Sequence, residues 1–151
     1  MLIRRIEKKD DAAVAAIIRE CLTEYGGDHR PDTAWSDPWL DRFSEYYVRE
    51  DNAYWVAESD DGTVVAGVGI GPLEGEVCEL QKMYCLKSYR GTGAAQQLVE
   101  TALRFAAEHY ARCYLETMDN MDRAKRFYER NGETIGSTGH GYCGCHYIKT
   151  L

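Results

Sequence analysis

The sequence has no long hydrophobic run, no excess of positive charge and little proline. No stretch is apolar enough to cross a membrane as a helix, and the start, MLIRRIEKKDDAA, lacks the apolar core of a signal peptide. The formal net charge of -7 argues against a broad surface for nucleic acid or anionic lipid. We therefore expect a cytoplasmic protein that binds neither nucleic acid nor membrane.

Linkers and repeats are missing as well. The chain has only 3 prolines, and no low-complexity tract or internal repeat interrupts it. Its apolar fraction of 44% and charged fraction of 28% are those of an ordinary globular protein. A length of 151 residues is enough for one substantial core, so we expect a single domain over residues 1–151.

The cysteines lack the paired C-x-x-C spacing of structural zinc sites. Four of the 6 lie in periodic apolar stretches, where cysteine acts as a small hydrophobe: Cys21, Cys78, Cys85 and Cys113. The tail GHGYCGCHY holds the other two cysteines together with two histidines: His140, Cys143, Cys145 and His146. On a strand, Cys143 and Cys145 would share one face and His146 would lie on the other. We expect no metal site.

Apolar spacing indicates an α/β fold with a mixed, partly antiparallel sheet of about six to seven strands flanked by about four helices. A helix capped by Asp10 or Asp11 ends at Gly26 and Gly27, and a second begins with Asp37 as its cap. The other expected helices cover residues 93–110 and 121–132, and the first of these should connect two parallel strands. Strands are expected at 2–6, 53–58, 63–70, 77–86, 111–118 and 144–151, with another near 134–137.

The segment SYRGTGAAQQ places an arginine and two glycines just before the helix at 93–110. The simple interpretation is a turn. The alternative is an anion site, because first-turn amides have no intrahelical partner and glycine lets a phosphate approach the backbone. A P-loop is excluded, since Ala94 and Ala95 follow Gly93 in place of Lys and Ser or Thr. A dinucleotide fingerprint is excluded by Gln96, which stands where a small residue is needed.

The stretch YRGTGAA resembles the Arg-x-x-Gly-x-Gly/Ala loop of the GNAT superfamily of N-acetyltransferases, which binds the diphosphate of acetyl-coenzyme A (acetyl-CoA). The strand ELQKMYCL and the later AKRFYERNG also resemble that family, as does the order of elements over essentially the whole chain. The resemblance implies a GNAT-like fold and acetyl-CoA as cosubstrate. Two departures, Glu133 for an aromatic residue and Met121 for an asparagine, should alter packing or cofactor contacts.

The same resemblance implies that an acetyl group moves directly to a primary amine within a ternary complex. An acidic protein suits a small-molecule amine or amino acid. Two alternatives stay open: a protein or peptide N-acetyltransferase, and a non-catalytic module that senses acyl-CoA. Dimers are frequent in the family, so a homodimer is also open.

Acetyl transfer requires a base for the amine, an acid for the departing thiolate and donors for the carbonyl oxygen. Glu79, at a family position for a general base, could act through a water, or it could be a surface glutamate in a salt bridge. Glu76 and Glu116 are lesser candidates for the base. Tyr128 matches the family tyrosine that protonates the sulfur, and the alternative is a tyrosine packed on the sheet. Acyl transfer through Cys85 is less favoured, because the sequence shows no obvious group to activate the thiol.

Cofactor contacts follow from the resemblance too. The strand from Glu79 to Cys85 should bulge and splay from its neighbour, with the amides of Met83 and Cys85 facing the acetyl and pantetheine groups. The full set of expected cofactor-binding residues is Met83, Tyr84, Cys85, Arg90, Gly91, Thr92, Gly93, Ala94, Ala95 and Gln96. The acceptor should lie near the first two helices and the last strands, where Trp35 and Tyr46 are candidates. The tail resembles that of some bacterial members of the family, which suggests that His140 also lines the acceptor site.

Overall fold

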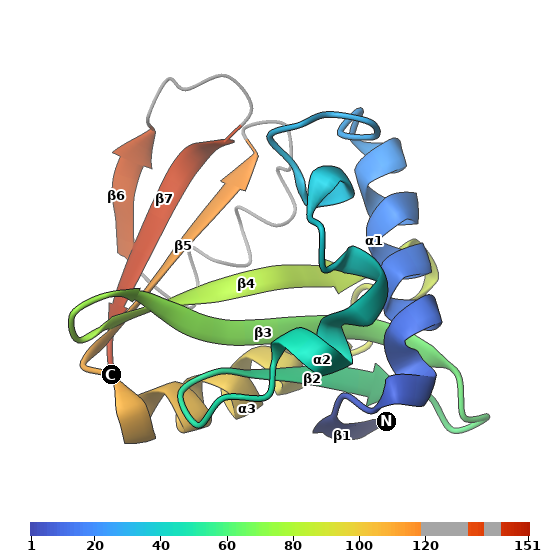
Figure 1. Cartoon of the computed structure of the whole chain (residues 1–151), viewed down its shortest axis with the longest axis horizontal. Coiled ribbons are helices and arrows are strands. Elements are labelled where there is room, and N and C mark those ends of the chain that lie inside the picture. Colours follow the sequence, from blue (N-terminus) through green and yellow to red (C-terminus); the bar gives the residue numbers. More distant parts are fainter. Residues whose placement is uncertain (119–132, 138–142) are drawn as a thin grey trace.

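The computed structural model describes residues 1–118, 133–137 and 143–151. The described residues form one sheet with the strand order β1-β2-β3-β4-β5-β7-β6 (Figure 1). The strands are β1 Leu2–Arg5, β2 Ala53–Glu58, β3 Val64–Glu74, β4 Val77–Cys85, β5 Arg112–Met118, β6 Glu133–Ser137 and β7 Cys143–Thr150. The α-helices among the described residues are α1 Asp11–Glu24, α2 Phe43–Tyr46 and α3 Ala94–His109.

The sheet is mixed, as the sequence predicts. Strands β1 to β4 pair antiparallel in chain order, and β4 pairs parallel with β5 through the crossover helix α3. Strand β7 then lies antiparallel between β5 and β6. The extra strand expected near residues 134–137 is confirmed as β6. Of the four expected helices, the one at 121–132 lies outside the described residues.

Helices α1 and α3 cover opposite faces of the sheet, and β2 shows this by alternation (Figure 1). Tyr54 and Val56 are buried in the cluster with α1, whereas Trp55 and Ala57 are buried in the cluster with α3. Because the sheet is covered on both sides here, all five residues from Ala53 to Ala57 are buried. The near-continuous apolar run of this strand follows from that double burial.

The prediction of a single helix that starts at Asp37 is wrong. Asp37 Oδ1 does accept a hydrogen bond from the Trp39 amide at 2.8 Å, but this bond closes a turn and no helix begins there. Instead, the chain forms only a short 3-10 turn at Leu40–Arg42 and then the four-residue α2. The break has a tertiary cause: Asp11 on α1 accepts hydrogen bonds from the Ser44 amide at 2.9 Å and the Ser44 hydroxyl at 2.6 Å. A carboxylate from another helix thus caps the new start.

Asp10 supports the start of α1 through a buried ion pair, and this gives a pH-dependent stability. Its carboxylate accepts hydrogen bonds from Arg4 Nη1 at 2.8 Å, Arg4 Nη2 at 3.0 Å and the Glu7 amide at 2.8 Å. Burial alone would raise the pKa of Asp10, but the hydrogen bonds from Arg4 and Glu7 outweigh burial and lower it. A lowered pKa contributes stability above the unfolded-state value, and this is lost as pH falls through the folded-state value.

We therefore expect Asp10→Asn to lower the free energy of unfolding by about 2 kcal/mol at pH 7. The difference from the wild type should shrink as pH falls below about 4, the unfolded-state value, and disappear below the folded-state pKa, where the native carboxylate is protonated too. Urea unfolding at pH 7 and pH 3 measures both values. Asp60→Asn, at a fully exposed carboxylate, is the control and should change stability by less than about 0.5 kcal/mol. A difference independent of pH would contradict the role given to the ion pair.

Candidate active site

Strands β4 and β5 part soon after they begin (Figure 1). Their pairing joins only Val77, Cys78 and Glu79 to residues 112–114. Beyond Glu79, β4 is paired among the described residues with β3 alone. The edge of β4 that faces the gap can therefore offer backbone groups to a ligand, and the divergence expected from the family resemblance is present.

A β-bulge lies at the same point of β4. Gly69 pairs with Gln81 and Gly67 with Tyr84, so Lys82 and Met83 together stand opposite a single residue of β3. Lys82 adopts a left-handed backbone with a φ of 50°, which is uncommon for a residue other than glycine. The bulge redirects the backbone just before Met83, Tyr84 and Cys85, the residues expected to face the thioester.

A buried tyrosine holds this bulge from the side of α1. The Tyr54 hydroxyl donates to the Lys82 carbonyl at 2.9 Å. Complete burial raises the pKa of Tyr54 well above its ordinary value, so the hydroxyl remains a donor. Gly67 on β3 makes the contact possible, because a Cβ there would lie 2.6 Å from the Tyr54 ring.

After β4 the chain makes a 3-10 turn at Lys87–Tyr89 and then enters the glycine loop. Gly91 and Gly93 have φ 80 and φ 92, a left-handed backbone that glycine adopts without strain. Gly93 stands at the N-cap of α3 and offers no side chain to its first turn. The amides of this turn and the helix dipole therefore suit an external anion, and the anion site stays a prediction.

Arg90 is engaged by the protein itself. Its Nη1 and Nη2 donate to the Glu24 carboxylate at 2.7 and 2.8 Å, and its Nε donates to the Cys85 carbonyl at 3.1 Å. The hydrogen bond from Arg90 also lowers the pKa of Glu24. This fork ties the glycine loop to the end of α1. Direct binding of diphosphate by Arg90 would require the guanidinium to share or leave this carboxylate, and it stays a prediction.

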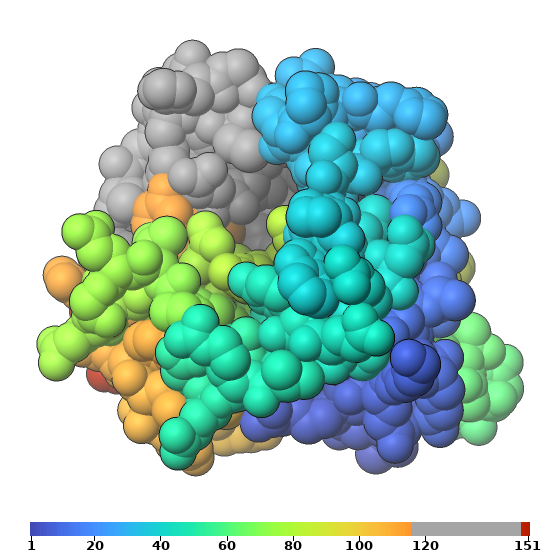
Figure 2. All heavy atoms as spheres, in the orientation of Figure 1, coloured from blue at the N-terminus to red at the C-terminus, as the bar shows by residue number. Residues whose placement is uncertain are grey.

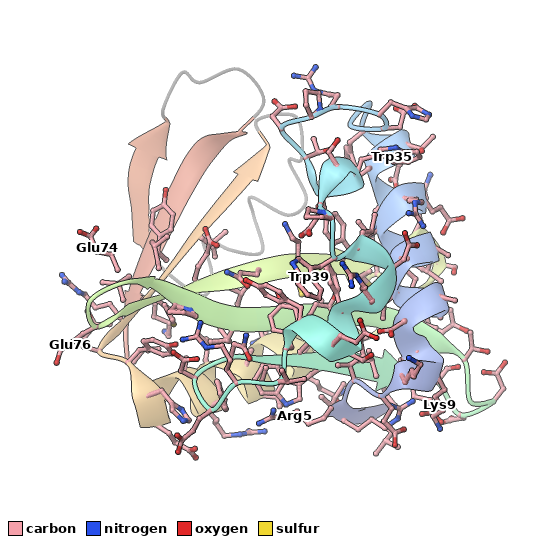
Figure 3. All side chains as sticks on the ribbon, viewed as in Figure 1. Arg5, Lys9, Trp35, Trp39, Glu74 and Glu76 are labelled. Carbon is pink, nitrogen blue, oxygen red and sulfur yellow. The ribbon has the colours of Figure 1, made fainter. Side chains whose placement is uncertain are left out.

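Glu79 lies where β4 and β5 part, and its carboxylate has a defined partner. Gln81 Nε2 donates to Glu79 Oε1 at 3.0 Å, and Gln81 Oε1 accepts from the Tyr47 hydroxyl at 2.8 Å. Sequence reasoning missed Gln81, although strand alternation places it on the same face as Glu79. Glu76 lies instead in the exposed β3–β4 turn, at the outer end of the hairpin (Figure 3).

The proposed acceptor side is formed by the segment before β2. Space-filling shows that atoms of β4 lie at the bottom of a recess beside residues 37–47 (Figure 2). Trp39 lies in front of β4, and its ring centroid is 5.6 Å from that of the half-exposed Tyr46 (Figure 3). Trp35 packs on His29, with ring centroids 4.4 Å apart, beside the far end of α1. It is therefore more distant from β4 (Figure 3). Tyr128 and His140 lie outside the described residues.

Two negative findings concern only the part of the chain that the structure describes. No group of three or more His, Cys, Asp or Glu side chains there could hold a metal ion. None of the helices described has the length and apolarity needed to span a membrane.

The first turn of α3 suits a diphosphate, and the chain just before it forms a bulged strand that parts from its neighbour. This is the arrangement of an acyl-CoA-dependent transferase. The particular family is shown by sequence: the model of the "Acetyltransferase (GNAT) family" matches residues 14–132, so the chain belongs to the GNAT family of N-acetyltransferases. The resemblance carried by YRGTGAA is confirmed.

Relatives and solved structures agree with this assignment. The chain is 38% identical over 159 residues to the uncharacterized N-acetyltransferase YjgM of Escherichia coli, covering 99% of this chain and 95% of the relative. An acetyltransferase of the GNAT family from Staphylococcus aureus has the same fold, with a TM-score of 0.86, 19% identity and coverage of 99% and 98%. YncA of Salmonella typhimurium, a putative acetyltransferase solved with acetyl-CoA, matches with a TM-score of 0.82, 16% identity and coverage of 100% and 94%.

Proposed function

We propose that the protein transfers the acetyl group of acetyl-CoA directly to a primary amine of a small molecule or amino acid, within a ternary complex. The observation that carries this proposal is the position of Glu79. Its carboxylate lies where β4 leaves β5, on the strand that leads through the bulge to the glycine loop. A cofactor anchored at the loop and extended along β4 would bring its thioester towards this carboxylate.

Main-chain donors would hold the cofactor. The amides from Gly91 to Gln96 would bind the diphosphate, with Thr92, Ala94 and Ala95 inside this range. Farther along the cofactor, the amides of Met83 and Cys85 and the backbone of Tyr84 would face pantetheine and the acetyl carbonyl. Donors fixed at the carbonyl oxygen stabilise the charge that it gains during attack.

The transfer forms a C–N bond and breaks the C–S bond of the thioester. Glu79 would accept the proton of the attacking amine through a water, which makes the nitrogen nucleophilic. Tyr128, by its match to the family tyrosine, would give a proton to the departing sulfur. The Cys85 thiol packs in the buried cluster with α3, which supports direct transfer over an acetyl-cysteine intermediate.

The proposed acceptor is recognised on the side of residues 37–47. Trp35, Tyr46 and His140 remain candidate contacts, and the position of Trp39 in front of β4 adds a fourth. The net charge of -7 favours a cationic amine. Transfer to a protein N-terminus and the sensing of acyl-CoA without turnover remain alternatives.

We expect Glu79→Gln to lower kcat by about a hundredfold with a small amine, because the neutral amide cannot accept the proton. The Kd for acetyl-CoA should stay within about twofold, since the cofactor anchor is untouched. Release of free coenzyme A measures turnover with a panel of small amines, amino acids and peptides, and calorimetry measures binding.

Each outcome separates the alternatives. Turnover on peptides alone would favour the protein N-acetyltransferase. Tight binding without turnover on any amine would favour the sensor, and unchanged turnover in Glu79→Gln would refute this base.

A further inference from the structure

Glu79 is the first of three side chains joined by hydrogen bonds on one face of the sheet. The Tyr47 hydroxyl donates to Gln81 Oε1 at 2.8 Å, and Gln81 Nε2 donates to Glu79 Oε1 at 3.0 Å. Tyr47 follows α2, and it is 7% exposed. The chain of bonds therefore runs from a buried aromatic cluster to the proposed base.

Two glycines of β3 make room for this chain. Gly69 pairs with Gln81 and Gly71 pairs with Glu79. A Cβ at Gly69 would lie 2.8 Å from the Tyr47 ring and hydroxyl, and a Cβ at Gly71 would lie 2.9 Å from Gln81 Oε1. Only a strand without side chains at these positions lets Tyr47 and Gln81 lie directly against it.

Tyr47 is held rigidly and stays protonated, so its hydroxyl has a proton to donate. Its ring meets Phe43 and Tyr46 edge-on, with centroids 5.6 and 4.9 Å apart, and packs on Tyr54 at 5.2 Å. Burial raises the pKa of Tyr47 well above its ordinary value, so the hydroxyl keeps its proton. A hydroxyl that donates to Gln81 Oε1 directs the other end of the amide, Nε2, towards Glu79.

We propose that Gln81 and Tyr47 are positioning residues for Glu79, an inference that rests on the proposed function. Tyr47 sets the orientation of the Gln81 amide, and Gln81 holds Glu79 Oε1. The second oxygen, Oε2, is then the one that accepts the proton of the amine through water. The carboxylate loses the freedom to rotate away from the gap, so a larger fraction of the molecules has the base in a productive geometry.

The test is a set of single and double substitutions, with kcat, KM and acetyl-CoA Kd measured for each. Gln81→Leu and Tyr47→Phe should each lower kcat about tenfold and leave the Kd for acetyl-CoA within about twofold. Gly71→Ala should have a similar effect, because the new methyl group displaces the Gln81 amide. Tyr110→Phe is the matched control: its hydroxyl donates to the Asp51 carbonyl, and its ring packs in the α3 cluster on the opposite face.

A double-substitution cycle separates positioning from a structural role. If Gln81 acts through Glu79, Gln81→Leu should change kcat less than about twofold in a Glu79→Gln background. A full tenfold loss in that background would overturn the proposal, as would unchanged kcat in both single variants. If Glu79→Gln alone has no effect, the assigned base fails. If the wild type acetylates no amine, the proposed function fails first.

Discussion

Ala95→Glu should weaken acetyl-CoA binding about a thousandfold while leaving the fold intact. Ala95 lies in the first turn of α3, where side chains lean towards the helix N-terminus. A carboxylate about 5 Å from one phosphate charge costs about 3 kcal/mol at an effective dielectric of about 20, and a diphosphate carries two such charges. With partial screening, about 4 kcal/mol remains, which is about a thousandfold in Kd.

The fold should tolerate this change, because a negative charge in the first turn favours the helix dipole. Ala95→Gln is the matched control of nearly equal size, and it should lose less than about tenfold in affinity. Calorimetric titration with acetyl-CoA and thermal unfolding of all three proteins measure the two effects separately. Near-normal binding by Ala95→Glu would show that the diphosphate lies elsewhere, and every role proposed for the glycine loop would fail.

Gly67→Ala should lower the free energy of unfolding by about 3 kcal/mol, although it adds one methyl group. That methyl carbon would lie 2.6 Å from Tyr54 Cε1 and from the Tyr54 hydroxyl oxygen. The ring cannot retreat, because it is 1% exposed and packs between Phe43 and Tyr47 at 5.3 and 5.2 Å. Displacing it would also break the hydrogen bond to the Lys82 carbonyl.

Urea unfolding measures the loss, and the midpoint of thermal unfolding should fall by roughly 6–12 °C. Gly71→Ala on the same strand is the matched control. The three atoms nearest to its methyl group would all belong to the end of the flexible Gln81 side chain, so it should cost less than about 1 kcal/mol. The two substitutions should thus have different effects: the one at Gly67 should lower stability, and the one at Gly71 should lower turnover. Equal losses of stability would contradict this distinction.

Local signals account for what the sequence predicts well. The helix over 93–110 has apolar residues at helical spacing and two glycines before its first turn, and the structure places it at Ala94–His109. The expected strands at 53–58 and 63–70 are separated by SDDG, a strong hairpin signal, and the Ser59 amide closes the turn there by donating to the Thr63 carbonyl at 2.8 Å. The gap between β4 and β5 has no such local signal, and only the family resemblance indicated it.

Contacts between distant residues account for what the sequence does not show. The start of α2 depends on Asp11, which lies 33 residues before Ser44. The partner of Arg90 is Glu24, 66 residues away, so the sequence suggested a guanidinium free for phosphate. The glycines of β3 look like interruptions of a strand until the rings of Tyr54 and Tyr47 are found against them.

The bulge at Lys82 reverses the parity of β4. Before it, the even-numbered Cys78 and Leu80 point into the cluster with α3, whereas after it the odd-numbered Met83 and Cys85 do so and Tyr84 belongs to the cluster with α1. Without the bulge, strict alternation would turn Tyr84 towards the cluster with α3 and present the Cys85 thiol to the acceptor side, the side of α1. The extra residue held in the bulge thus keeps a nucleophilic sulfur on the α3 side, and a shift of register that brought Lys82 into regular pairing would turn that sulfur to the opposite face.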